Sequence, residues 1–134
     1  MGTIFQQPTF TEPLTFFEYL NSIKLTSIAL SNGISAKKIK FGSLENCTNF
    51  VISPTNVCEV FEFDNWKQGD LNLSALNLLT PQSIHYIIQH AMSIADGATA
   101  RTLTLHATAK TNWEASEYYQ EDLAVLEEKG ITIA

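Results

Sequence analysis

Three histidines are the side chains of this 134-residue chain best suited to acid–base chemistry or metal binding. His85 and His90 lie five residues apart in a predicted helix, so they do not share a face as a metal-binding pair at i and i+4 would. We expect both at the surface. His106 ends a predicted strand, where an exposed or hydrogen-bonded imidazole is the simplest interpretation. A small enzyme that uses His106 is the alternative.

The carboxylates do not form a catalytic pair. Glu59 and Glu62 are three residues apart on a predicted strand, which points them to opposite faces. Glu117, Glu121 and Asp122 are expected on the outside of a helix, where a weak cation site is the alternative to an ordinary solvated face. The glycines are scattered and form no phosphate-binding loop. We therefore predict no catalytic residue, no metal site and no cofactor.

Two cysteines, Cys47 and Cys58, are too few for a disulfide framework or a complete zinc site. Buried thiols packed in a strand ladder are the favoured interpretation. A single bridge between the two residues stays open.

Composition narrows the classes of partner. The chain is 45% hydrophobic, 16% charged and carries a formal net charge of −6. Residues 113–129 hold six acidic residues and one lysine, whereas the only clustered cations are Lys37, Lys38 and Lys40. Because phosphate backbones attract clustered cations, we expect neither nucleic acid nor an anionic membrane surface as a partner.

The length predicts a single globular unit. We find neither a signal peptide nor an apolar run long enough to span a membrane, so the compartment stays unknown. Within the unit we expect an N-terminal extension and capping helix over 1–24, followed by a repeat domain over 25–134.

A repeat is visible in the first half of the chain. Apolar residues two positions apart recur in steps of 11 residues, and this alternation puts both members of each pair on one face of a strand. The pairs are Ile28/Leu30, Ile39/Phe41, Phe50/Ile52 and Phe61/Phe63. A full turn of 22 residues falls within the leucine-rich-repeat range. Strands at 26–30 and 49–52 should therefore stack on one side, and those at 38–41 and 60–63 on the other.

The second half keeps the front strands but predicts helices on the back. Leu71-Asn72-Leu73 is the next front strand, one residue out of strict register. Thr80 and Pro81 mark a helix start, and Asp96-Gly97 its end. The apolar stripe of this helix comprises Ile84, Ile87, Ile88, Ala91, Ile94 and Ala95.

Two further strands and one helix complete the predicted second half. Residues 102–105 read as a strand, followed by a capping box at 111–114 that should open the next helix. Gly130 ends that helix, and residues 131–133 form the last strand. The helix should bury a stripe comprising Ala115, Tyr119, Leu123 and Leu126. Residues 12–23 read as an additional helix, which would cap the open end of the stack.

Several segments resemble the BspA-like leucine-rich repeats of gut bacteria and their phages. The resemblance spans roughly residues 25–134 and is structural in kind. The segments that carry it are Leu25–Leu30, Glu45–Phe50, Leu71–Leu73, Thr80–Ile84, Leu103–His106 and Glu127–Ile133. It implies a short solenoid with a parallel front sheet, backed by β-arcs and then by helices. It also implies binding of a protein or glycan at a cell surface or phage particle.

Small polar residues are expected on the outward face of such a stack, where repeat proteins bind their partners. The outward positions are Ser27, Ala29, Val51, Asn72, Thr102, Thr104 and Thr132. Our candidate binding residues are Trp66, Asn72, Thr102, Thr104 and His106. An exposed Trp66 would be an anchor; the alternative is that it packs between the two halves of the chain.

The expected function is therefore a non-catalytic, adhesin-type binding module for a protein or glycan. The alternative is a structural component of a larger assembly, such as a phage virion part or the C-terminal cap of a longer repeat protein. Self-association through free sheet edges belongs to that second expectation.

Overall fold

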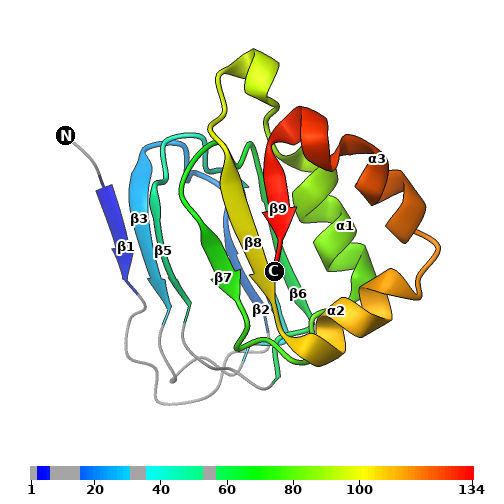
Figure 1. Ribbon diagram of the computed structural model, residues 1–134. Helices are drawn as coiled ribbons and strands as arrows, with labels where there is room; N and C mark the ends of the chain where they lie inside the picture. Colours follow the sequence, from blue (N-terminus) through cyan, green and yellow to red (C-terminus); the bar gives the residue numbers. More distant parts are fainter. Residues whose placement is uncertain (1–2, 7–15, 31–35, 53–56) are drawn as a thin grey trace.

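A computed structural model describes residues 3–6, 16–30, 36–52 and 57–134. Within them the chain is mixed α/β, with three small parallel sheets and three α-helices (Figure 1). The strands are β1 (Thr3–Gln6), β2 (Phe16–Tyr19), β3 (Leu25–Leu30), β4 (Lys38–Ser43), β5 (Asn49–Ile52), β6 (Val60–Asp64), β7 (Leu71–Leu73), β8 (Arg101–Leu105) and β9 (Ile131–Ile133). The helices are α1 (Pro81–His90), α2 (Ala107–Glu114) and α3 (Tyr119–Lys129), with a 3-10 turn at Ile94–Asp96. No helix in the described ranges is long and apolar enough to cross a bilayer.

The first half forms two parallel sheets whose register follows the predicted repeat. One sheet has the order β1-β3-β5 and the other β2-β4-β6. Ser27 lies opposite Asn49 and Lys38 opposite Val60, a step of 22 residues in both sheets. The predicted pairing of 26–30 with 49–52, and of 38–41 with 60–63, is therefore confirmed.

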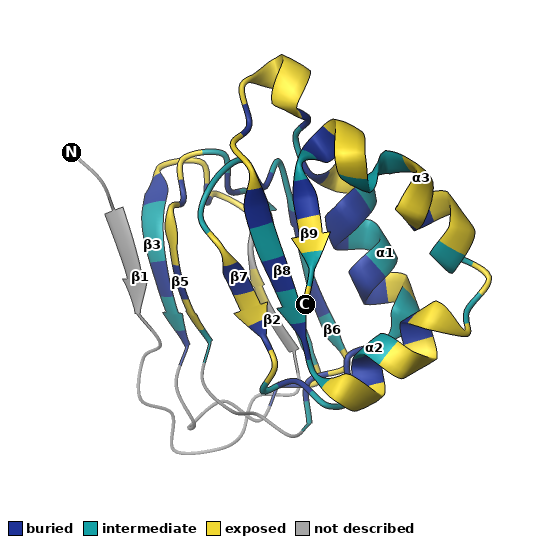
Figure 2. Cartoon of the chain, in the orientation of Figure 1, coloured by how far each residue is buried: buried dark blue, intermediate teal, exposed yellow. Residues whose placement is uncertain are grey.

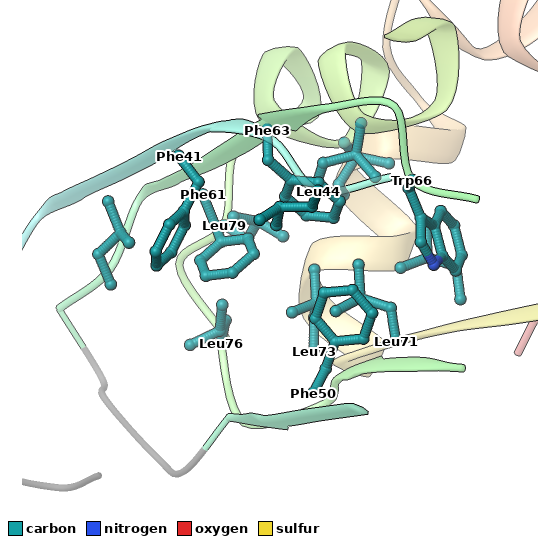
Figure 3. Close-up of a cluster of buried hydrophobic side chains, with 14 of the residues drawn as sticks. Phe41, Leu44, Phe50, Phe61, Phe63, Trp66, Leu71, Leu73, Leu76 and Leu79 are labelled. Carbon is teal, nitrogen blue, oxygen red and sulfur yellow. The ribbon is translucent and has the colours of Figure 1, made fainter. Parts of the chain in front are cut away.

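The inward faces of these two sheets fill the space between them (Figure 3). Phe50 of β5 stacks on Phe63 of β6 with ring centroids 5.8 Å apart. Phe41 and Phe61 stand next to each other along the second sheet, 6.2 Å apart. In β4 and β6 buried residues alternate with half-buried ones, so one face of these strands packs into the core.

The predicted N-terminal helix is wrong in its described part. Phe16–Tyr19 is strand β2, which pairs in parallel with β4 so that Phe17 lies opposite Ile39. The rest of the helical prediction at residues 12–15 lies outside the described residues. Pairing with β4 supplies backbone partners that a helix lying across the end of the stack would not supply. The N-terminal extension therefore adds strands β1 and β2 to the two sheets.

The expected single front sheet is divided. β7 forms a separate sheet with β8 and β9, in the order β7-β8-β9, and no hydrogen-bonded ladder joins it to β5 in the described part of the chain. Figure 1 shows β7 lying alongside β5 nonetheless. Gly69, just before β7, has φ +82, and a Cβ there would lie 2.2 Å from the Thr48 carbonyl oxygen. The chain therefore passes close to Thr48 just before β7, the strand that lies one residue out of the repeat register.

Helix α1 begins where predicted and closes the edge of β6. Thr80 is the N-cap, and its hydroxyl oxygen accepts a hydrogen bond from the Ser83 amide at 3.3 Å. The Ser83 hydroxyl accepts from the Phe61 amide at 2.9 Å and donates to the Phe61 carbonyl at 2.8 Å. One side chain therefore replaces the backbone partners that a further strand would give to Phe61.

Helix α1 ends at His90 rather than at the predicted Asp96-Gly97. Residues after His90 leave the helix to bond with the chain beside β6: the Asn65 amide donates to the His90 carbonyl at 2.9 Å, and the Met92 amide donates to the Trp66 carbonyl at 3.0 Å. Ile94, which the sequence predicts in the apolar stripe of this helix, therefore lies in a separate 3-10 turn.

Strands β8 and β9 confirm the two last predicted strands, but the capping box is wrong. Helix α2 starts at Ala107, so Thr111–Glu114 lies in its C-terminal half. Helix α3 starts only at Tyr119 and ends, as predicted, before Gly130, which has φ +68. Figure 2 shows many exposed residues on α2 and α3, whereas α1 is mostly buried or half-buried.

Candidate functional site

The outward-facing residues of the sheets form the surface that the sequence predicts to bind a partner. Residues predicted to face outward are half-buried or exposed. The strand neighbours on either side of Asn72, Thr102 and Thr104 are buried. Val51 and Asn72 are exposed, and Thr102 and Thr104 are half-buried. This face combines hydroxyl and amide groups with little steric bulk.

The structure brings three of the candidate residues together on one sheet. Asn72 of β7 lies opposite Thr104 of β8, and Thr102 lies opposite Thr132 of β9. The Asn72 carbonyl oxygen Oδ1 accepts from the Ser74 amide at 3.0 Å, which fixes the side chain and leaves its NH₂ group to donate outward. The pairs form two parallel rows of polar side chains.

His106 lies at the carboxyl end of β8, beyond Thr104, and is half-buried. Its Nδ1 accepts a hydrogen bond from the Thr108 amide at 3.0 Å, so the imidazole is the N-cap of α2. An Nδ1 that accepts leaves the proton of the neutral ring on Nε2. His106 therefore has a structural task as a cap, and only Nε2 remains to contact a ligand.

Trp66 is not at the surface, so its prediction as an exposed anchor is wrong. Its side chain is fully buried, and Nε1 donates to the Gly69 carbonyl at 2.9 Å. The Arg101 guanidinium carbon lies 4.7 Å from its ring centroid. As the alternative interpretation held, the indole packs between the two halves of the chain.

Arg101, which sequence reasoning did not select, is buried without a carboxylate partner. Its two terminal nitrogens donate to the carbonyls of Thr99, Lys129, Trp66 and Met92 at 2.6–2.9 Å. Burial lowers the pKa of this guanidinium to about 10, so it stays charged at neutral pH. The side chain ties three other backbone segments, at Trp66, Met92 and Lys129, to strand β8.

Asp122 is the centre of a second buried polar cluster. The sequence predicts it on the outer face of α3, but it is fully buried. Oδ1 accepts from His85 Nδ1 at 2.7 Å and from Gln89 Nε2 at 2.8 Å, and Oδ2 accepts from Trp113 Nε1 at 2.7 Å. One carboxylate therefore joins α1, α2 and α3.

His85 is the partly exposed member of the Asp122 cluster, and 24% of its side chain is accessible. Its ring stacks on Tyr118 with centroids 4.5 Å apart. A buried carboxylate on Nδ1 orients the imidazole as a general base would require. The hydrogen bond that the structure shows for this ring is the one to Asp122.

Sequence reasoning missed the Asp122 cluster because the three donors lie 9 to 37 residues from Asp122. The helical stripe was assigned to apolar residues, yet Leu123 is 40% exposed while Asp122 and Lys129 are buried. Lys129 lies in the same stripe and donates to the carbonyls of Ile88 and Gln89. Only the spacing of Asp122 and Lys129, seven residues or two helical turns, could have indicated a shared buried face.

Both cysteines are free and buried, as favoured from the sequence. The Cys47 thiol donates to the Asn49 carbonyl, and the Cys58 thiol donates to the Val60 carbonyl. Burial raises the pKa of Cys47 to about 11 and that of Cys58 to about 12. These thiols are therefore uncharged and poor nucleophiles at neutral pH.

Metal-ligating side chains do not gather in the described ranges. There, no three His, Cys, Asp or Glu residues lie close enough to hold an ion. The alternative cation site at Glu117, Glu121 and Asp122 is not formed, because the Asp122 carboxylate turns inward to its three donors.

Comparisons with known proteins add no family. No family model matches the chain. No curated protein and no solved structure matches it either.

Proposed function

We propose that the chain is a non-catalytic binding module that recognises a protein or glycan through the outward face of sheet β7-β8-β9. The observation that carries this proposal is the pair of rows Asn72–Thr104 and Thr102–Thr132. Their side chains are small, polar and attached to strands whose opposite faces are buried. A rigid backbone therefore presents hydroxyl and amide groups in fixed positions, which reduces the entropy lost on binding.

The proposal includes a leucine-rich-repeat-like solenoid as the architecture. It is supported by the step of 22 residues in both sheets of the first half, since leucine-rich repeats have 20–29 residues. It is also supported by Ser83, which follows Phe61 by 22 residues and continues the same spacing into α1. The resemblance to BspA-like repeats adds a cell surface or phage particle as the expected setting.

The test is a binding screen against glycan and protein arrays, with Asn72→Arg/Thr104→Arg as the blocking variant. Two long charged side chains would cover the Asn72–Thr104 row without entering the core. We expect any ligand retained by the unaltered protein to be lost, by about 100-fold or more, because hot-spot residues typically contribute 2 kcal/mol or more each.

Gln120→Arg/Ala124→Arg is the matched control. Both residues are exposed on α3, away from the two rows. We expect this variant to retain the ligand. Equal binding by the blocking variant would remove the outward face from the function.

A structural component of a larger assembly is the second candidate. It is favoured by β1 and β2, which end their sheets and have no described strand at their outer edges. Such edges are templates for further strands. Solution mass from light scattering tests it: a strict monomer across a 100-fold range of concentration would count against assembly through copies of this chain.

A further inference from the structure

Two sheets end on the helical side of the molecule, and their last strands differ. At β6, the Ser83 hydroxyl bonds both backbone groups of Phe61, and the Thr80 amide donates to the Glu59 carbonyl at 2.9 Å. Helix α1 therefore closes that edge. At β9, which ends the order β7-β8-β9, no described strand or helix plays this part.

The free backbone groups of β9 follow from its bonds to β8. The Gly130 carbonyl accepts from the Arg101 amide at 2.9 Å, and Ala134 both donates to Leu103 and accepts from Leu105 at 2.9–3.0 Å. Alternate residues of a strand point their N–H and C=O groups to opposite sides. Because residues 130 and 134 face β8, buried Ile131 and half-buried Ile133 must direct their backbone groups away from β8.

Charge around this edge has one sign. The exposed charged residues from 113 onward are Glu114, Glu117, Glu121, Glu127 and Glu128. The only lysine of this segment, Lys129, is buried and donates to the carbonyls of Ile88 and Gln89. Arg101 of the adjacent strand is buried too. The exposed charged residues closest in sequence to β9 are Glu127 and Glu128, so a ligand at this edge meets carboxylates.

We propose that the open edge of β9 binds an extended, lysine- or arginine-rich segment of another protein, which adds to the sheet as a further strand. The Ile131 and Ile133 backbone groups would give affinity through main-chain hydrogen bonds, as in β-strand addition generally. Glu127 and Glu128, in the turn before β9, would select basic side chains. Pairing with the same edge of a second copy would bring two acidic helices together, so a copy of this chain is disfavoured.

The probe is a synthetic peptide of about ten residues that alternates valine with lysine, compared with one that alternates valine with glutamate. Binding is measured by fluorescence anisotropy, and hydrogen exchange of the full chain locates the site. We expect only the lysine peptide to bind, with new protection at the Ile131 and Ile133 amides. Binding without protection at these two amides would overturn the proposal.

Ile133→Pro tests the hydrogen bonds. Proline removes the outward N–H of residue 133 while residues 132 and 134 keep their bonds to β8, a position that edge strands tolerate. We expect about fivefold weaker binding of the lysine peptide, because one hydrogen bond contributes about 1 kcal/mol. Unchanged affinity would contradict strand addition.

Glu127→Lys/Glu128→Lys tests the charge and does not depend on how Ile133→Pro folds. We expect the variant to lose the lysine peptide and to gain the glutamate peptide. Glu45→Lys/Glu59→Lys is the control, since it changes the net charge equally in the first half of the chain. Equal loss in both double variants would mean unspecific charge attraction and would overturn the proposal. Neither result bears on the outward face, which Asn72→Arg/Thr104→Arg tests separately.

Discussion

The two halves of the chain bury different kinds of side chain. Residues 16–64, where strands pack against strands, bury apolar groups, two thiols and one serine hydroxyl within the described ranges. The later half buries three charged side chains, Arg101, Asp122 and Lys129. The two halves therefore provide hydrogen-bond partners for their buried backbone groups in different ways.

The difference follows from what each element leaves unpaired. A strand inside a parallel sheet bonds its backbone groups to both neighbours, so apolar stacking is enough to complete the structure. A helix leaves its last carbonyls without partners. Lys129 bonds the carbonyls of Ile88 and Gln89 near the end of α1, and Arg101 bonds that of Met92 just beyond it. Replacing strands with helices thus requires buried donors.

Of the substitutions that test this comparison, Arg101→Met should lower the free energy of unfolding most. The change keeps much of the apolar volume but removes the Arg101 donor from four carbonyls, of which that of Trp66 keeps the Met92 amide. We expect a loss of about 4 kcal/mol in the free energy of unfolding, because each unsatisfied buried group costs about 1–3 kcal/mol and part of that cost is relieved by water. Urea denaturation followed by circular dichroism measures it.

Phe61→Leu is the matched substitution in the strand half. A change between apolar residues in a packed core usually costs about 1–2 kcal/mol, since it loses volume but no hydrogen bond. A larger loss for Phe61→Leu than for Arg101→Met would break the contrast between the halves. Arg101→Lys should recover part of the loss, because it keeps the charge but cannot fork to four carbonyls.

Asp122→Asn should have the next largest effect on the free energy of unfolding. The amide keeps one acceptor oxygen, so at least one of the bonds from His85, Gln89 and Trp113 is lost. Because these three donors come from α1 and α2, we expect about 2–3 kcal/mol of destabilisation and looser packing of α3. Hydrogen exchange of the α3 amides measures the second effect.

Glu121→Gln is the control for Asp122→Asn. It removes a carboxylate from the adjacent, exposed position of the same helix. Exposed charges contribute little to stability, so Glu121→Gln should change the free energy of unfolding by less than about 0.5 kcal/mol. Equal effects of the two substitutions would mean that the Asp122 bonds do not fasten the helices.

Local patterns in the sequence were enough to predict most of the strands and the start of α1. Alternation in steps of 11 residues locates β3 to β6, because each strand must bury one face. Thr80 and Pro81 locate the start of α1, because both act within one turn of the chain. These features depend on neighbours close in sequence.

The errors arose where the decisive partner is distant. The aromatic residues of β2 fit a helical stripe as well as a strand, and only pairing with β4 decides between them. Subtracting 22 from Ile39 gives Phe17, so the repeat itself carried the missed signal. Trp66 and Asp122 were misplaced for the same reason, since their partners in the fold are remote in sequence.

The smallest predicted effect concerns the buried thiols of the strand half. They should cause a fall in stability at alkaline pH. Burial raises the pKa of Cys47 to about 11 and that of Cys58 to about 12, above the ordinary value of 9.0. Above pH 9 the unfolded chain releases thiol protons that the folded chain retains, so stability is full below pH 9 and is lost as pH rises toward 11–12. Each thiol should contribute a loss of about 1 kcal/mol at pH 10.

Cys58→Ala isolates this effect, because the readout is the slope of stability against pH and not its value at neutral pH. We expect the variant to lose stability less steeply than the unaltered protein between pH 9 and 11, measured by urea denaturation at each pH. Tyr86, whose pKa is raised to about 12 by burial and its hydrogen bond to Asp64, is present in both proteins and does not change the difference between their slopes. An unchanged slope in Cys58→Ala would show that the strand half exposes its thiol before it unfolds, and the halves would then differ less than their burial indicates.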